Sequence, residues 1–397
     1  MNNLTILAPT KQGQTDLNQA IQACIEATPS TVFSADVLAF INALSKQLLQ
    51  DVSAKQHAEL VALGFWLRTS HMQALKNQQP AGLSKALGLV LHFTPANVDS
   101  MFVYSWVCSL LMGNNNIVRV ASAESAAKNV LLNTLNVLFE QTEFRKLAKR
   151  NLFVSYPRES SLSAKLSLHA DARVIWGGDA SVNAIRALPI KPRCRDISFA
   201  DRYSAALING DDLKDEQQVA QLASLLWRDT QPHQQQACSS PRVIFWLGDT
   251  QLQHSLFTQI NQLAGQQGSE INQLNNHLAV SQVMQSSGVV GKPLIQQTIC
   301  VLPISELRAE FLDWHMGTGL FLLMPLSKLD DLADNIDNKL QTLSYWGMEQ
   351  EQLLKLVAQP SIKGIDRIVK VGHALTFSPD WDGYHVLDEL SRHIFVG

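Results

Sequence analysis

Residues 87–120 read LGLVLHFTPANVDSMFVYSWVCSLLMGNNNIVRV. Two short apolar runs, Leu87–Phe93 and Ile117–Val120, flank a longer apolar segment, Val98–Met112. Short apolar runs are typical of buried strands, whereas the longer segment has the length of a helix. Two buried strands joined by a helix indicate a right-handed βαβ unit in a parallel sheet.

The same alternation continues along the chain. Further strands are expected at 152–155, 173–176, 204–208, 243–247, 298–302, 320–323 and 366–369, and helices at 124–139, 160–169, 181–188, 216–228, 252–264 and 327–336. Upstream of Gly82, helical spacing occurs at 16–27, 35–49 and 54–68. Strands that alternate with helices predict an α/β protein with two mainly parallel sheets. The polar stretch Asn209–Asp215 is the expected boundary between two domains.

Composition excludes several classes of protein. Hydrophobic residues make up 46% of the 397 residues and charged residues 17%, which is enough for a large buried core. Thirty-two Lys and Arg against 35 Asp and Glu give a net charge of −3, so we expect no nucleic-acid partner. The most apolar stretch, Met101–Met112, is too short to span a membrane, and the N-terminus does not resemble a signal peptide. The five cysteines form no C-x-x-C pair, and no metal-ligand spacing occurs, so we expect no metal and a cytoplasmic, reducing location.

The first candidate for chemistry is Cys238, in the segment Gln234–Pro241 before a predicted strand. Small residues on both sides leave the thiol reachable, as a nucleophile requires. The alternative is a small buried apolar side chain, which most lone cysteines are. His233 is a candidate base for this thiol.

Three other segments end predicted strands. Asn97 follows Thr94 and Pro95 and stands near the start of the helix at 98–112, where its amide can stabilise an oxyanion or simply cap the helix. Arg119 is placed to contact a nucleotide phosphate or ribose, or is an ordinary surface cation. The turn Gly177–Asp179 opens a helix and can approach a phosphate closely, although it is not a G-x-G-x-x-G fingerprint.

Taken in order, these segments resemble the aldehyde dehydrogenase superfamily and, more closely, its LuxC-type branch, the fatty acyl-CoA reductases of bacterial luminescence operons and their relatives. The superfamily pattern is matched by Pro95-Ala96-Asn97, Gly113-Asn114, Ile117-Val118-Arg119, Gly177-Gly178 and Cys238. The branch is matched by Ile190–Arg193, Phe199–Ser204, Gln236–Pro241, Gln341–Tyr345 and Trp381–Tyr384. The resemblance runs from about Gly82 to the C-terminus.

The resemblance implies an aldehyde-dehydrogenase-like fold with a Rossmann-type cofactor domain and a second α/β catalytic domain. The expected division is an N-terminal helical segment at 1–82, a nicotinamide-binding domain at 83–208, a catalytic domain carrying the nucleophile at 209–375 and a C-terminal segment at 376–397. It also implies NADPH-dependent reduction of a fatty acyl-CoA or acyl-protein thioester to the aldehyde. Acyl-transfer proteins are possible partners, and a homo-oligomer is expected.

In that mechanism Cys238 carries the acyl group, and Asn97 with the backbone N–H of Cys238 holds the oxyanion. The cofactor-binding residues are Thr94, Pro95, Arg119, Ser122, Gly177, Gly178 and Asp179. Ser122 stands where NAD-preferring members of the superfamily often carry a Glu, which favours NADPH. No carboxylate aligns with the water-activating Glu of hydrolytic relatives, since Asp201 is offset. A Cys-dependent acyltransferase or thioesterase without hydride transfer is the alternative.

Overall fold

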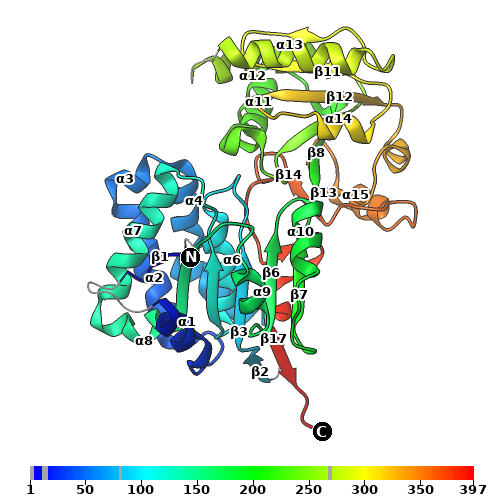
Figure 1. Cartoon of the computed structure of the whole chain (residues 1–397). Helices are drawn as coiled ribbons and strands as arrows, with labels where there is room; N and C mark the ends of the chain where they lie inside the picture. The colour runs from blue at the N-terminus through cyan, green and yellow to red at the C-terminus, as the bar shows by residue number, and fades with distance from the viewer. Residues whose placement is uncertain (1–3, 11–16, 80–82, 267–270) are drawn as a thin grey trace. The chain divides into compact units, whose positions relative to one another are not determined.

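The computed structural model describes residues 4–10, 17–79, 83–266 and 271–397. The chain forms two compact units, one made of residues 1–200 and 377–397 and the other of residues 201–376 (Figure 1). The second unit is therefore an insertion between Ala200 and Phe377 of the first. Both units combine helices with mainly parallel sheets, so the predicted α/β class is confirmed.

The first unit is built around a six-stranded sheet with the order β1-β5-β4-β3-β6-β7. Its strands are β1 (Thr5–Ala8), β3 (Leu89–Phe93), β4 (Asn115–Arg119), β5 (Asn151–Ser155), β6 (Ala172–Trp176) and β7 (Arg195–Phe199). β1 pairs antiparallel with β5, and the other pairings are parallel. The five parallel strands follow the order of a dinucleotide-binding half, and the chain reverses direction across the sheet between β3 and β6.

Helices cover this sheet, and α6 is its central packing element. The helices are α1 (Leu17–Glu26), α2 (Ala35–Gln50), α3 (Val52–Lys55), α4 (Ala58–Trp66), α5 (Thr69–Asn77), α6 (Met101–Leu111), α7 (Ala126–Glu140), α8 (Arg145–Ala148), α9 (Leu162–Ser167), α10 (Asp179–Arg186) and α16 (Val386–Glu389), with a 3-10 turn η1 (Thr142–Phe144). Every residue of α6 is buried. Trp106 on α6 makes edge contacts with Phe40 of α2 at 5.8 Å and with Phe153 of β5 at 5.0 Å between ring centroids. An aromatic cluster thus fixes α6 between the sheet and the outer helices.

The last residues return to the first unit through two small antiparallel pairs. The strand β17 (Ser391–Ile394) pairs with β2 (Leu83–Ala86), and β15 (Asp380–Trp381) pairs with β16 (Tyr384–His385). The side chain of Asn114 donates a hydrogen bond of 2.8 Å to the carbonyl of Leu390. Residues 377–397 therefore belong to this unit.

The second unit has a seven-stranded sheet with the order β10-β11-β12-β9-β8-β13-β14, parallel except for β10. Its strands are β8 (Tyr203–Asn209), β9 (Pro241–Leu247), β10 (Leu294–Ile295), β11 (Cys300–Pro303), β12 (Leu320–Leu326), β13 (Leu340–Trp346) and β14 (Arg367–Lys370). Its helices are α11 (Glu216–Thr230), α12 (Gln253–Gly265), α13 (Ile271–Gln285), α14 (Ala309–Asp313) and α15 (Gln350–Val357), with 3-10 turns η2 (Gly210–Asp212), η3 (Pro232–Gln235) and η4 (Leu329–Asp334). The two faces of the sheet carry separate buried apolar clusters.

Three sequence-based expectations differ from this architecture. The strand expected at the end of the first domain, β8, pairs with β9 and β13 in the second sheet, so the units divide after Ala200 and not at residue 208. The residues at 1–82 and at 376–397 belong to the first unit instead of forming separate segments, and β1 of the former is a strand of its main sheet. The helix expected at 327–336 is the 3-10 turn η4, since the acidic run Asp330, Asp331 and Asp334 gives it little apolar surface to bury.

A buried carboxylate holds the chain where it leaves the second unit. Asp229 of α11 accepts hydrogen bonds from the backbone N–H of Gly372 at 2.5 Å and of Ala374 at 3.1 Å. Arg228 donates to the carbonyl of Gly372 from two of its nitrogens, at 3.0 and 2.6 Å. Burial raises the pKa of Asp229 to about 7, against the backbone hydrogen bonds and Arg228, which lower it.

This raised pKa predicts a pH-dependent stability. The folded state binds a proton on Asp229 more tightly than the unfolded state, so the stability contribution is full at acidic pH and is lost as the pH rises toward 7. Between pH 5 and pH 8, we expect the free energy of unfolding of the wild-type chain to fall by about 1–4 kcal/mol more than that of Asp229→Asn. Denaturant unfolding of both proteins at the two pH values measures this difference. Identical pH slopes for the two proteins would contradict the assignment.

Candidate functional site

Cys238 lies in the turn that leads into the amino end of β9 and is half-buried. Its carbonyl accepts a hydrogen bond of 2.7 Å from the hydroxyl of Ser204 on β8. The same hydroxyl accepts a hydrogen bond of 3.2 Å from the backbone N–H of Thr342 on β13. One buried serine therefore ties the cysteine turn to two central strands of the sheet.

The residues before Cys238 have an unusual backbone. His233, Gln234 and Gln235 follow one another with φ values of 55°, 53° and 63°. Each left-handed residue other than glycine costs about 1–2 kcal/mol, so other contacts must hold this segment in place. The expectation that His233 is a base for Cys238 stays a prediction.

The fully buried amide of Gln235 supplies such contacts. Its nitrogen donates to the carbonyls of Pro241 at 2.8 Å and Leu320 at 2.9 Å, and its oxygen accepts from the backbone N–H of Gly319 at 3.0 Å. A buried amide whose donors and acceptor are used in this way rigidifies its surroundings. Gln235 thus joins the cysteine turn to the start of β12.

The other cysteine thiols provide a contrast to Cys238. Burial raises the pKa of Cys24, Cys108 and Cys300 to about 12, and burial raises that of Cys194 to about 11. These four thiols are protonated at neutral pH and are poor nucleophiles. Their raised pKa values argue against these four thiols as the nucleophile.

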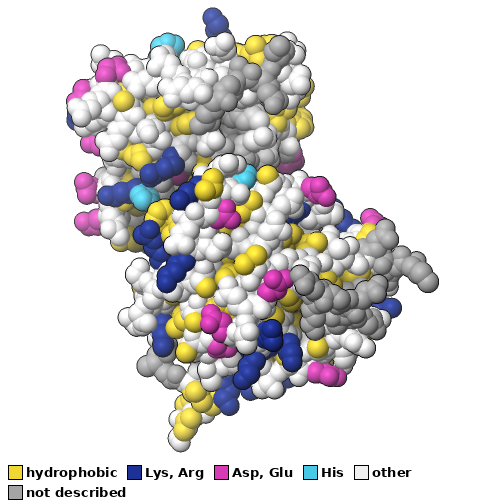
Figure 2. Space-filling view, turned by 90° about the vertical axis from the view of Figure 1, so that its left-hand side faces the viewer, with side chains coloured by type: hydrophobic (Ala, Val, Ile, Leu, Met, Phe, Trp, Pro, Cys, Tyr) yellow, Lys and Arg dark blue, Asp and Glu magenta, His cyan; other side chains and the backbone are white. Residues whose placement is uncertain are grey.

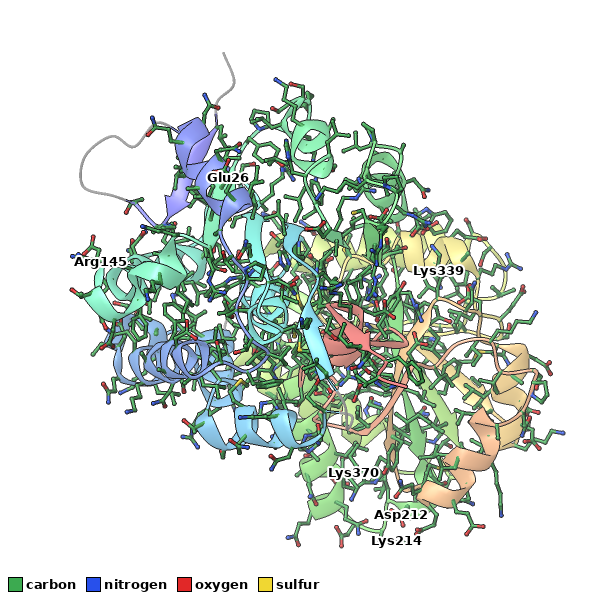
Figure 3. All side chains as sticks on the ribbon, turned by 90° about the horizontal axis from the view of Figure 1, so that it is seen from below. Glu26, Arg145, Asp212, Lys214, Lys339 and Lys370 are labelled. Atoms are coloured by element: carbon green, nitrogen blue, oxygen red, sulfur yellow. The ribbon has the colours of Figure 1, made fainter. Side chains whose placement is uncertain are left out.

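Charged and titratable groups surround the cysteine turn. Arg242, the second residue of β9, is half-buried, and burial lowers its pKa, while the charges of Asp201 and Cys238 raise it. The carboxylate of Asp201 also pairs at 3.3 Å with the ammonium of Lys339, a residue that is labelled in Figure 3. Asp201 is therefore paired with one cation and lies within electrostatic reach of a second.

His315 is buried near the same group. Its Nδ1 accepts a hydrogen bond from the backbone N–H of Gly317 at 3.1 Å, and its Nε2 lies 2.8 Å from the carbonyl of Leu320. Burial and, second to it, the positive charge of Arg242 lower the pKa of His315 to about 3. His315 is thus neutral at physiological pH.

The predicted cofactor residues lie in the first unit at the carboxyl ends of its parallel strands. Thr94 follows β3, and its hydroxyl donates to the carbonyl of Arg119 at the end of β4, at 2.9 Å. Gly177 follows β6, where its N–H donates to the carbonyl of Phe199 at 3.1 Å. Because β3 and β6 flank the point at which the strand order reverses, Thr94 and Gly177 lie where open α/β sheets bind ligands.

Arg119 is the most constrained of these residues. Its guanidinium donates to the carbonyl of Tyr156 at 3.1 Å and lies over the Tyr156 ring, 5.0 Å from the centroid. Burial lowers the pKa of Arg119, and its Nε is buried without a hydrogen-bond partner among the described atoms. Arg119 is thus not an ordinary surface cation.

The remaining cofactor candidates are more exposed. Gly178 is the N-cap of α10, and a Cβ placed on it would meet no atom within 4 Å. Asp179, in the first turn of α10, and Ser122, in the loop after β4, are exposed, and Pro95 is half-buried. An accessible glycine at a helix N-terminus leaves the backbone open to a ligand, although the charge of Asp179 opposes an anion there.

Asn97 is an exposed residue in the bend between β3 and α6. The N-cap of α6 is Ser100, three residues further along the chain, because the helix begins at Met101 and not at Val98. Asn97 is therefore not the cap of this helix, and that alternative interpretation is wrong. Its role as an oxyanion donor stays a prediction.

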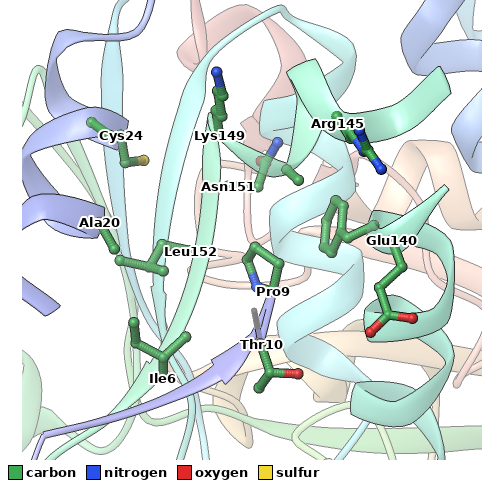
Figure 4. A pocket seen from close by; sticks show the side chains of 13 residues that line it. Ile6, Pro9, Thr10, Ala20, Cys24, Glu140, Arg145, Lys149, Asn151 and Leu152 are labelled. Carbon is green, nitrogen blue, oxygen red and sulfur yellow. The ribbon is translucent and has the colours of Figure 1, made fainter. Parts of the chain in front are cut away.

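A cavity of about 680 Å³ lies elsewhere in the first unit, among β1, α1, α7, α8 and β5 (Figure 4). Ile6, Ala20, Cys24 and Leu152 form apolar parts of its wall, and Arg145 adds a charge. None of the predicted site residues lines this cavity. It gives no support to the predicted chemistry.

Two expected absences concern other classes of site. Among the described residues, no group of three or more His, Cys, Asp or Glu side chains could hold a metal ion. No helix within the described ranges is long and apolar enough to cross a membrane.

The face drawn in Figure 2 intersperses basic, acidic and hydrophobic side chains without one sign of charge prevailing.

A known protein family matches most of the chain. The profile of the family described as acyl-CoA reductase (LuxC) matches residues 30–287, more than half of the chain. The chain belongs to this family. The resemblance inferred from the motifs is thereby confirmed.

Two relatives of this LuxC family member are long-chain acyl-protein thioester reductases. The protein of Aliivibrio fischeri is 24% identical over 208 residues, which cover 52% of this chain and 40% of that protein. The protein of Photorhabdus luminescens is 24% identical over 302 residues, which cover 72% of this chain and 58% of that protein. The chain thus spans about half the length of these curated relatives.

Solved structures confirm the aldehyde-dehydrogenase-like fold of the family member. PnpE from Pseudomonas sp. WBC-3 superposes with a TM-score of 0.66 at 14% identity, over 90% of this chain and 82% of that one. An NAD-dependent aldehyde dehydrogenase from Sinorhizobium meliloti superposes with a TM-score of 0.67 at 11% identity, over 95% and 85%. At these identities the likeness concerns the fold alone.

The side chains that support Cys238 are not evident from the sequence. Ser204 and Gln235 lie within the segments quoted above, but nothing in the sequence assigns them a role. The signal for Gln235 was its place in a short polar run before a buried strand. Arg242 gave no signal, because its significance depends on the turn that brings it toward the thiol.

Proposed function

We propose that the chain reduces an acyl thioester to the aldehyde with NADPH, through an acyl group bound to Cys238. The observation that carries this proposal is the half-buried Cys238 turn, held by Ser204 and Gln235, in a member of the LuxC family. The names of the two reductase relatives support an oxidoreductase acting on long-chain acyl thioesters.

The proposed reaction begins with attack of the Cys238 thiolate on the carbonyl carbon of the thioester. The side-chain amide of Asn97 and the backbone N–H of Cys238 are the proposed donors to the oxyanion. CoA leaves as its thiolate, and the acyl group remains on Cys238. After reduction, the thiohemiacetal on Cys238 collapses to the aldehyde and returns the Cys238 thiolate.

The residues at the carboxyl edge of the first sheet fit a nicotinamide cofactor. The buried, unpartnered Nε of Arg119 suits a ribose or phosphate oxygen, and the open backbone at Gly178 suits close approach of a ligand. The residues that would hold the cofactor are Thr94, Pro95, Arg119, Ser122, Gly177, Gly178 and Asp179. The chemistry that the cofactor supplies when bound is a hydride for the acyl carbon. PnpE, which shares this fold, has been solved with nicotinamide adenine dinucleotide.

NADPH is proposed over NADH because of the charges around Ser122. The ammonium of Lys128 donates to the carbonyl of Ala121, the residue before Ser122, at 3.0 Å. A serine at position 122 does not repel a ribose 2′-phosphate, and the Lys128 ammonium attracts it.

The acyl donor is proposed to be a fatty acyl-CoA or an acyl-protein thioester. Acyl-transfer proteins are the proposed partners, and a homo-oligomer is the proposed assembly. A cytoplasmic location is also proposed. The free state of all five cysteines supports it, because thiols persist in a reducing compartment.

Cofactor-free turnover tests the proposal. Without NADPH, acyl-CoA should release about one equivalent of CoA per active site and then little more, because the pairing of Asp201 with Lys339 opposes its action as a base for water. With NADPH, aldehyde should appear in step with the cofactor consumed. Stopped-flow detection of CoA thiol, with product analysis, measures both phases.

The alternative function is a thioesterase or acyltransferase that uses the same acyl-enzyme. It predicts steady release of free fatty acid without cofactor, at a rate comparable to NADPH oxidation. That result would replace the reductase with the hydrolytic alternative. Loss of the first CoA equivalent would instead contradict the acyl-enzyme itself.

A further inference from the structure

Arg242 stands four residues after Cys238, at the beginning of β9. Three groups lie within electrostatic reach of its guanidinium, namely Cys238, Asp201 and His315. The Nε of Arg242 is buried and has no hydrogen-bond partner among the described atoms. A buried cation with an unused donor is costly unless an anion lies nearby.

Asp201 and His315 leave much of the positive charge of Arg242 uncompensated. His315 is neutral and contributes no negative charge. Asp201 is shared, since its carboxylate pairs with Lys339 at 3.3 Å. Of the three groups near Arg242, the thiolate form of Cys238 is the remaining anion that can complement the guanidinium.

We infer that Arg242 is a positioning residue that holds Cys238 as the thiolate before acyl transfer and again when the aldehyde leaves. This inference rests on the proposed function for its role in turnover. The thiolate itself can be measured without any substrate.

A permanent cation suits this chemistry better than a histidine base does. The thiolate forms a bond to the acyl carbon, CoA departs as a thiolate, and no proton moves in that exchange. After hydride addition from the nicotinamide donor, the oxyanion re-forms the carbonyl and expels Cys238 as a thiolate. The proton of the overall reaction goes from solvent to the CoA thiolate. Because an arginine stays protonated, it cannot remove a proton from water and hydrolyse the acyl-enzyme.

The test is the pH dependence of carbamidomethylation of Cys238 in the full chain. Iodoacetamide reacts with the thiolate, and mass spectrometry resolves each cysteine. Arg242→Met should raise the midpoint of the Cys238 profile by about 1–2 pH units, so that the rate at pH 7 falls roughly tenfold or more. Arg242→Lys should restore most of the reactivity, because it retains a positive charge.

Two controls separate charge from structure. Arg308→Met removes a half-exposed arginine whose partner is Glu306, and it should leave the Cys238 profile unchanged. Asp201→Asn removes the anion that competes for Arg242, so it should shift the midpoint of the Cys238 profile to lower pH. This variant keeps the inference testable if Arg242→Met does not fold.

An unchanged midpoint in folded Arg242→Met overturns the inference. If Arg242→Met does not fold, an unchanged midpoint in Asp201→Asn overturns it.

The same proteins distinguish this inference from the proposed function. If Arg242→Met shifts the alkylation midpoint but the wild type takes no label from acyl-CoA, the thiolate pair stands and the reductase proposal fails. If the wild type is acylated and folded Arg242→Met keeps the wild-type profile, the reductase proposal stands and the role of Arg242 fails.

Discussion

Cys238→Ala should abolish both acyl transfer to the protein and aldehyde formation. The other four thiols are protonated by burial, with pKa values raised to about 11 or 12, so none of them can replace the nucleophile. The expected loss is complete within detection, because no covalent intermediate can form. Labelled acyl-CoA followed by denaturing electrophoresis measures the acylation, and NADPH oxidation measures turnover.

Cys194→Ala is the matched control for this experiment. Cys194 is the other cysteine that is only partly buried, and it lies in the first unit. Its replacement should leave acyl labelling at the wild-type level. Label that persists on Cys238→Ala at that level would show that another residue carries the acyl group.

Asn97→Ala should slow turnover by ~10²–10³ while leaving the fold intact, which is the usual cost of removing one oxyanion donor. The side chain is exposed, so its removal creates no cavity. Unfolding midpoints measured beside kcat separate the two effects. Acylation in the absence of cofactor should slow as well, because the same oxyanion forms in that step.

Ser100→Ala provides the structural comparison for Asn97→Ala, since Ser100 occupies the N-cap position of α6. Any change that it causes should appear in stability and not in turnover per folded molecule. If Asn97→Ala loses stability and keeps wild-type kcat, Asn97 is a structural residue and the oxyanion assignment is wrong.

The apolar strands and helices were predictable from the sequence, and polar strands were not. β3, β4 and β6 each contain a short run of buried apolar residues, so their pattern shows directly. β13 was missed because Gln341, Thr342 and Ser344 are polar. They are fully buried, and the backbone N–H of Thr342 is satisfied by the hydroxyl of Ser204 from the neighbouring strand.

β7 was missed for a related reason. Its residue Asp196 forms an ion pair of 2.6 Å with Arg173 of β6, whose side chain is fully buried. The charges that argue against a strand in the sequence are thus neutralised across the sheet. A single sequence does not reveal which distant residue supplies such a partner.

The residues of the candidate site were also predictable only in part from the sequence. Cys238, Asn97 and Arg119 could be proposed from local motifs, because each stands at a strand end or turn. The supporting set of Ser204, Gln235 and Arg242 acts through contacts that exist only after β8, β9 and β12 have assembled. Sequence spacing alone therefore does not reveal it.

The insertion of residues 201–376 into the first unit has a consequence for synthesis of the protein. A ribosome translates the whole second unit before it makes Phe377–Gly397, whose strand β17 pairs with β2 from the first part of the chain. The second unit can therefore acquire its structure on the nascent chain while the first still lacks the Leu390 carbonyl that Asn114 binds. Completion of the first unit is a late step, because it closes a loop of just over 300 residues between β2 and β17.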